Sequence, residues 1–191
     1  GAGLDLGHLV FSQFLMDASA LVSALVVALL PLVIHLVGSA STSRYHRLAL
    51  HPRNPQSIWA IASYPLVHVN FRHLAFNCVP LLLLGLLIAT KSVSTYWLAT
   101  VLILLVGGWG TWLFSSADRV AGASGLVFGY WGFIIASAAL SEDPFWTAAA
   151  ALTLMVYAGL WSSLMKLEGG ISWAGHFWGL VGGITSAVLV S

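Results

Sequence analysis

Long apolar runs separated by short polar stretches dominate this sequence. Six of these runs come close to, or reach, the roughly 20 residues that an α-helix needs to cross a lipid bilayer. They cover Ser19 to Val37, Val69 to Thr90, Thr95 to Phe114, Ala123 to Ser141, Phe145 to Ser163, and Ile171 to Val190. Short connections between the later runs make neighbouring helices antiparallel. The pattern therefore predicts an all-α membrane protein, with residues 1–191 forming a single bundle of six transmembrane helices.

One apolar segment does not fit this simple pattern. The stretch from Ile58 to His68 contains Pro65 and continues into the second predicted span without a polar break. Joined to that span, it would make a helix far longer than a bilayer requires. We therefore predict a partly embedded, non-spanning segment before the second helix. Its irregular backbone must be covered by protein or water, because lipid offers no hydrogen bonds.

Composition supports the membrane assignment and narrows the partners. Hydrophobic residues make up 59% of the chain and charged residues 7%, whereas soluble domains carry roughly 25% charged residues. The net charge of +1 lacks the basic footprint of a nucleic-acid-binding protein. The single cysteine, Cys78, provides neither an internal disulfide nor a zinc cluster. We expect an integral multi-pass protein whose surroundings are the lipid bilayer and which binds no nucleic acid.

Few strongly polar side chains fall inside the predicted spans, and each is a functional candidate because its burial in lipid is costly. They include His35, His73, Asn77, Ser124 and His176. Spans two, four and six start from the same face of the membrane. At 1.5 Å per residue, His73, Ser124 and His176 therefore lie roughly 3–8 Å below that face. Agreement in depth makes these residues candidates for one shared site.

The fourth and sixth spans carry the residue types of nucleophilic catalysis. Ser124 lies between glycines in Gly122-Ala123-Ser124-Gly125, and small residues recur along both spans. Such stripes let transmembrane helices pack closely. Close packing would bring Ser124 within hydrogen-bond reach of His176, as a nucleophile and its general base. Phe128 follows Ser124 by one turn and is placed to stack on the imidazole.

The second predicted span adds hydrogen-bond donors. His73 and Asn77 are four residues apart, so they share one face of their helix. Two donors aimed at one point are what an oxyanion hole requires. Each residue taken alone has a plainer interpretation: a serine in a transmembrane helix is usually a packing residue, and His68 would serve equally well to anchor the segment before the second span. The hypothesis depends on their joint occurrence.

Other proteolytic chemistries fit this sequence poorly. No H-E-x-x-H zinc motif occurs. Spans two to six contain no aspartate for an aspartyl mechanism, and both lysines, Lys91 and Lys166, fall in predicted loops. What is left is a Ser-His pair without a buried acid as a third member.

Three motifs in this order resemble those of the rhomboid intramembrane serine proteases, over residues from about 65 to 190. They are His68-x4-His73-x3-Asn77, Gly122-Ala123-Ser124-Gly125-Leu126-Val127-Phe128-Gly129, and Gly175-His176-x2-Gly179-x3-Gly183. Each motif is weak alone, and together they are specific. Many members of the family have a tyrosine where this chain has Phe128.

The resemblance implies a fold, a site and an activity. The fold is a six-helix, rhomboid-like bundle. The site is a Ser124–His176 dyad, with His73, Asn77 and the Ser124 amide as oxyanion donors. Supporting positions are His68, Gly122, Gly125 and Phe128. The implied activity is cleavage of transmembrane protein substrates near the membrane edge, without a metal or organic cofactor.

Two alternative functions fit the same residues less well than a protease does. A catalytically silent relative that binds membrane clients usually lacks the serine or the histidine, and a transporter would spread polar groups over several depths.

Loops one, three and five share one face and carry most of the basic residues: Arg44, Arg47, Arg53, Arg119 and Lys166. The positive-inside rule would place this face in the cytoplasm. The resemblance implies that it faces outward from the cell (plasma or inner) membrane, and we follow the resemblance.

Overall fold

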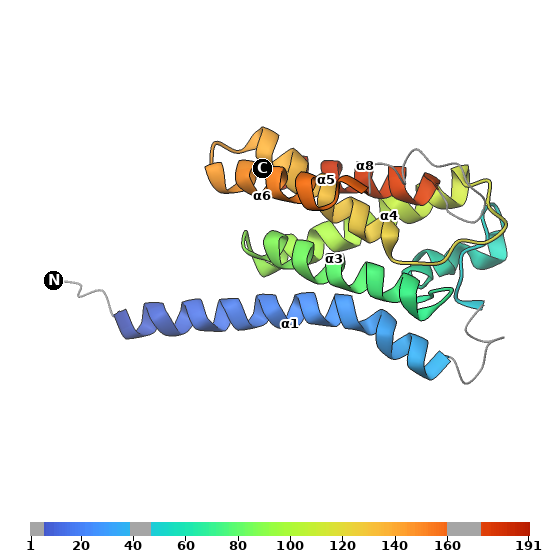
Figure 1. Ribbon diagram of the computed structural model, residues 1–191, viewed down its shortest axis with the longest axis horizontal. Coiled ribbons are helices and arrows are strands. Elements are labelled where there is room, and N and C mark those ends of the chain that lie inside the picture. The colour runs from blue at the N-terminus through green and yellow to red at the C-terminus, as the bar shows by residue number, and fades with distance from the viewer. Residues whose placement is uncertain (1–5, 39–46, 160–172) are drawn as a thin grey trace.

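The computed structural model describes residues 6–38, 47–159 and 173–191. In these ranges the regular secondary structure is helical apart from one isolated antiparallel bridge, which confirms the predicted all-α class. The elements are α1 (Leu6–Gly38), η1 (Pro55–Ile61), η2 (Tyr64–Leu66), α3 (Phe71–Ala89), α4 (Val93–Phe114), α5 (Ser124–Leu140), α6 (Pro144–Val156) and α8 (Trp173–Leu189). Figure 1 shows α1 lying along one edge of the bundle beside α3, with α5, α6 and α8 on the far side of α3.

Three of the described helices are long and apolar enough to cross a membrane. They are Ala18–Gly38 within α1, Phe71–Ala89 and Val93–Phe114. The protein is therefore an integral multi-pass membrane protein. Helices α5, α6 and α8 have 17, 13 and 17 described residues, fewer than the sequence predicted. Helix α5 is the central element, since most of its side chains are buried by its neighbours.

Two predicted boundaries differ clearly from the structure. The first helix begins at Leu6 and not near Ser19, because the residues before Ser19 contain no proline or other break that would end it. The fifth predicted span was to run from Phe145 to Ser163, but α6 ends at Val156. Tyr157 leaves the helical conformation there, with φ −105° and ψ 21°. The last predicted residues, 160–163, lie outside the described ranges.

The segment before α3 is non-spanning, in agreement with the prediction. It forms η1 and η2, and each 3-10 helix has a proline in its first turn, where a missing N–H costs nothing. The chain is extended at Val67, and the Asn70 side chain then accepts a hydrogen bond from the His73 amide at 2.8 Å. This N-cap starts α3 at Phe71 and separates it from the preceding turns.

The chain just before η1 is tied to the end of α4 and to the loop that leads into α5. Leu50 and Val120 exchange backbone hydrogen bonds of 2.9 and 2.8 Å. The Arg53 guanidinium donates to the Ser115 carbonyl, and the Trp112 indole donates to the Asn54 carbonyl at 3.2 Å. Hydrogen bonds from other segments therefore hold the loop that precedes Ser124 in place.

Helices α5 and α8 form the most extensive helix pair of the bundle, and their backbones touch at glycines. A Cβ atom at Gly179 would overlap the carbonyl of Gly125, and one at Gly183 would overlap the carbonyl of Gly129. Only glycine leaves enough room for such an approach. The close packing aligns the beginnings of α5 and α8, where Ser124 and His176 lie.

Candidate active site

Ser124 and His176 come together at the beginnings of two adjacent helices. Ser124 is the first residue of α5, and His176 lies in the first turn of α8. Their Oγ and Nε2 atoms are 3.0 Å apart, a hydrogen-bond distance, although the residues are 52 positions apart in the chain. His176 is buried, whereas Ser124 is only partly covered. A hydroxyl paired with an imidazole in this way is suited to act as a nucleophile with a general base.

The Phe128 ring holds the imidazole of His176 from one side. The two rings are stacked, with centroids 4.4 Å apart and planes inclined by 27°. Phe128 is itself buried, and it lies one helical turn after Ser124. The contact restricts rotation of the imidazole and keeps Nε2 directed at the serine hydroxyl.

The turn before Ser124 depends on a glycine. Gly122 has φ +122°, a conformation that other residues rarely adopt, and its amide donates to the Tyr64 carbonyl at 3.0 Å. A Cβ atom at this position would lie 2.8 Å from Cε1 of His73. The missing side chain is therefore what lets the His73 ring lie against this turn, two residues before Ser124.

His68 supports the same turn from the other side. Its Nε2 atom accepts a hydrogen bond from the Ala123 amide at 3.2 Å, and its ring packs edge-on against His73 with centroids 5.2 Å apart. Because Nε2 is the acceptor, the neutral ring carries its proton on Nδ1. Burial, followed by the nearby charge of His73, lowers the pKa of His68 from 6.5 to about 4. The residue is thus held neutral where it positions the backbone of the site.

The beginning of α5 lacks a side-chain cap. Ala123 occupies the N-cap position and provides no such hydrogen bond, so the N-cap side chain does not neutralise the positive end of this helix. Asn77 is buried in α3, and its amide nitrogen donates to the His73 carbonyl of its own helix at 2.8 Å. One of its two N–H donors is used in this way. The convergence of His73 and Asn77 on one point stays a prediction.

Tyr64 belongs to this site, and the sequence analysis did not identify it. Its carbonyl holds Gly122, and its hydroxyl would be 3.2 Å from a Cβ atom placed on Gly125. Burial raises the pKa of Tyr64 to about 12, against the opposing effect of a hydrogen bond with Thr111. An aromatic residue in a non-spanning apolar segment carries no spacing signal, so only the fold reveals this role.

We expect acid to weaken the site through His68. Because folding lowers the pKa of His68 from 6.5 to about 4, the unfolded chain binds the proton more readily in this window. The free energy of unfolding should therefore fall as pH drops from 6.5 towards 4, and be fully retained above 6.5. Thermal unfolding in detergent, measured between pH 8 and pH 4, checks this expectation.

Two variants separate the acceptor role of His68 from its titration. His68→Gln retains an acceptor near the Ala123 amide but has no titratable group, so its unfolding should depend less on acid. His68→Leu leaves that buried N–H without an acceptor, at a cost of about 1–3 kcal/mol at every pH. Equal acid sensitivity of His68→Gln and the parent protein would contradict this role.

Fold and site together define an integral membrane protein of packed helices, in which a serine and a histidine from two helices meet at a glycine-lined contact. The sequence matches the Rhomboid domain over residues 55–191, and the chain belongs to the rhomboid family. It is 34% identical over 174 residues to an uncharacterized protein of Mycobacterium tuberculosis, covering 86% of this chain and 72% of the relative. An uncharacterized protein of Mycobacterium leprae is 33% identical over 144 residues, covering 70% and 57%.

Proposed function

We propose that this protein is a serine endopeptidase that hydrolyses peptide bonds in or near the transmembrane segments of other membrane proteins. The observation that carries the proposal is the 3.0 Å contact between Ser124 Oγ and His176 Nε2. Membership of the rhomboid family, which includes serine proteases, supports it. The mycobacterial relatives are uncharacterized, so they add no activity of their own.

In the proposed reaction, Ser124 Oγ attacks the carbonyl carbon of the scissile bond. His176 Nε2 accepts the hydroxyl proton and then donates it to the leaving amine, which forms an acyl-enzyme. Water then attacks the ester, with His176 again acting as the base. The stacking of Phe128 on the imidazole keeps the base oriented through both halves of the reaction.

The oxyanion is assigned to groups around the beginning of α5. The Ser124 amide lies at a helix start without a side-chain cap, where the helix dipole favours negative charge. His73 lies against Gly122 in the turn that leads to Ser124, and Asn77 lies one turn further along α3. These donors would stabilise the negative charge that develops on the carbonyl oxygen.

In this proposal, water reaches the site from one face of the membrane. We assign a membrane crossing to all six α-helices of the described residues, with Ser124, His73 and His176 each in the first turn of its helix. The pair would then lie close to one face of the cell membrane, the outer face in the favoured orientation. A substrate segment must unwind there, because the carbonyls of an intact helix are already hydrogen-bonded.

The test combines covalent labelling with cleavage of a single-span reporter in liposomes. The parent protein should cut the reporter, and a fluorophosphonate should label Ser124, as located by peptide mass spectrometry. Ser124→Ala should lose the label, whereas Ser137→Ala, a buried serine in the same helix, should keep it. If the parent protein is neither labelled nor active, the chain is a client-binding member of the family.

A further inference from the structure

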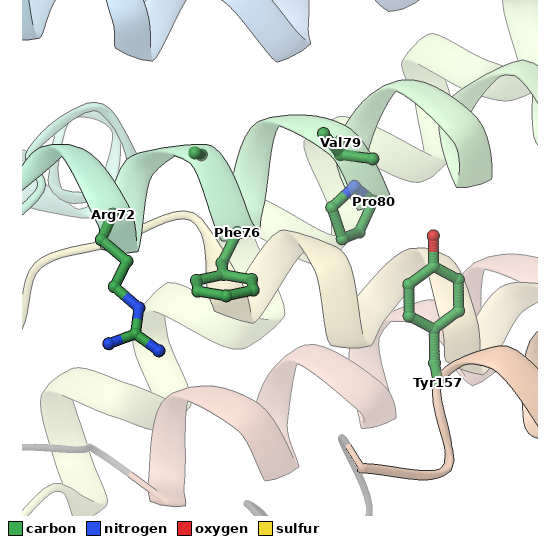
Figure 2. Close-up of a pocket in the computed structure, with 6 residues that line it drawn as sticks. Arg72, Phe76, Val79, Pro80 and Tyr157 are labelled. Carbon is green, nitrogen blue, oxygen red and sulfur yellow. The ribbon is translucent and has the colours of Figure 1, made fainter.

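A small polar cavity lies at the end of the bundle opposite the Ser124–His176 pair. Helices α3, α5 and α8 run in the same direction, so their last residues come together at this end (Figure 1). The cavity is separate from the pocket in Figure 2, whose residue Arg72 lies near the beginning of α3. It has a volume of about 170 Å³, and its lining includes Lys91 just after α3, Ser137, Leu140 and Ser141 at the end of α5, and Ala187 and Val190 around the end of α8.

The Ser137 hydroxyl is buried at this cavity and is not bonded to its own helix. Ser137 is 2% exposed, and within the described residues its Oγ atom has no hydrogen-bond partner. Other buried hydroxyls of the bundle do bond back, since Thr100, Thr111 and Ser186 each donate to the carbonyl four residues earlier, at 2.6–2.7 Å. A buried polar group without a partner is costly. The Ser137 hydroxyl therefore has a hydrogen bond to offer to a molecule in the cavity.

The Lys91 ammonium is directed towards the same face of α5. Its Nζ atom lies 5.9 Å from the centroid of the Phe133 ring and 5.7 Å from that of the Trp146 ring. Phe133 and Ser137 are four residues apart, so they share one face of their helix. The attraction of a cation to two aromatic rings holds the ammonium over this face. Among the described residues, it forms no ion pair with a carboxylate.

The polar groups of this cavity are mainly hydrogen-bond donors. Ser141 Oγ already accepts a hydrogen bond from the Asp143 amide at 3.1 Å, which leaves its O–H to donate. An ammonium has three N–H donors and no acceptor. The Asp143 carboxylate accepts from the Phe145 amide at 2.9 Å and so caps the beginning of α6. A ligand rich in acceptors and negative in charge fits this set best.

The depth of the cavity indicates which anion meets it. Lys91 lies between two membrane-spanning helices, Phe71–Ala89 and Val93–Phe114, and therefore at a membrane edge. Phosphate groups of lipids lie at this level of a bilayer. A phosphate presents its oxygens tetrahedrally, so it can accept from donors on α5 and from Lys91 at the same time. A carboxylate presents two oxygens in one plane and matches donors on two walls less well.

We propose that the cavity between the ends of α5 and α8 binds a phosphate group through the Lys91 ammonium and the hydroxyls of Ser137 and Ser141. A phospholipid headgroup and free inorganic phosphate share this chemistry. Ser137 lies 13 residues after Ser124, or roughly 20 Å along α5, so the site is separate from the Ser124–His176 pair. Binding does not require the protein to be a protease.

Native mass spectrometry of the purified chain in detergent tests the proposal with three probes. They are dioleoylphosphatidylglycerol, dioleoylglycerol, which has the same acyl chains without the phosphate, and inorganic phosphate. Binding of the phospholipid at least ~10-fold more tightly than the diacylglycerol identifies a headgroup as the source of the phosphate. Binding of inorganic phosphate without such a preference between the lipids identifies the free ion.

Substitutions at the cavity should weaken binding of whichever phosphate probe the parent protein binds. We expect a ~10-fold loss in Lys91→Gln and a ~5-fold loss in Ser137→Ala, because a charge-assisted contact contributes more than a neutral one. Lys91→Arg keeps the charge and should bind within ~3-fold of the parent protein. The matched controls are Arg119→Gln, which removes a charge near the other end, and Ser186→Ala, which removes a buried hydroxyl bonded to its own helix.

Two outcomes would overturn the proposal. The first is equal binding of the two lipids together with no binding of inorganic phosphate. The second is an affinity of Lys91→Gln equal to that of Arg119→Gln, which would show that Lys91 only balances the negative ends of the helices. Lys91 is exposed, so this comparison holds even if a buried substitution impairs folding. Ser124→Ala should bind phosphate as the parent protein does, so failure of the proposed protease function leaves this result unaffected.

Discussion

Replacing His176 with alanine is expected to lower the rate of reporter cleavage by at least ~10³-fold, and replacing Ser124 should lower it as much, because the two residues act as a unit. His176 Nε2 lies 3.0 Å from Ser124 Oγ, and without it the serine has no base to accept its proton. The double variant should be no slower than either single variant. Single-turnover cleavage in liposomes measures this loss apart from substrate binding.

Because His176 is buried, the comparison needs a control for folding. Each variant should retain the thermal unfolding profile of the parent protein to within a few degrees, so that lost activity reports lost chemistry. Ser137→Ala removes a hydroxyl from the same helix as Ser124 and should cleave the reporter at the parent rate. Residual activity in His176→Ala within ~10-fold of the parent would show that the pair is not the catalytic machinery.

Introducing one methyl group at Gly183 is expected to separate the two helices that carry the site. A Cβ atom there would overlap the carbonyl of Gly129 and lie 2.9 Å from the Phe133 amide, and neither backbone group can rotate away. Overpacking of a core typically costs about 1–3 kcal/mol, and we expect Gly183→Ala to reach the upper end. In a chain of this length, a loss of about 3 kcal/mol lowers the melting temperature by roughly 6–12 °C.

The matched control for this change is Gly159→Ala. Among the described residues, a Cβ atom at Gly159 would meet nothing within 4 Å, so the same chemical substitution should leave both melting temperature and cleavage close to those of the parent protein. Gly183→Ala should also lose most of its activity at temperatures where it remains folded, because Ser124 and His176 lie on the displaced helices. A melting temperature of Gly183→Ala equal to that of Gly159→Ala would contradict the close α5–α8 approach.

Properties that depend on neighbouring residues along the chain were predictable. The hydrophobic runs predicted helices at α3, α4 and α5 within a few residues, since each helix must satisfy its own backbone in lipid. Pro65 indicated the non-spanning segment before α3. The positions of His73, Ser124 and His176 near the beginnings of their helices also followed from counting residues, because the rise per residue is constant.

Boundaries were less predictable where hydrophobicity does not change. The residues before Ser19 and those after Phe145 are apolar enough that a helix boundary could fall at several positions. Caps or turns decide which of these positions it takes. Asp143 accepts a hydrogen bond from the Phe145 amide and starts α6, but nothing in the apolar run itself marks its end at Val156. The hydrophobic pattern shows which residues tolerate lipid, but it does not determine the residue at which a helix ends.

Contacts between distant segments were decided by tertiary structure alone. The sequence by itself determined the all-α class, the approximate helices α3, α4 and α5, and the positions of Ser124 and His176 near the beginnings of their helices. Only the packing of α5 against α8 determined that these two side chains meet, and only the fold placed His68 on the Ala123 amide and Tyr64 beneath Gly122. The reason is physical: spacing along one helix is set by local geometry, whereas a distance between helices depends on every side chain packed between them.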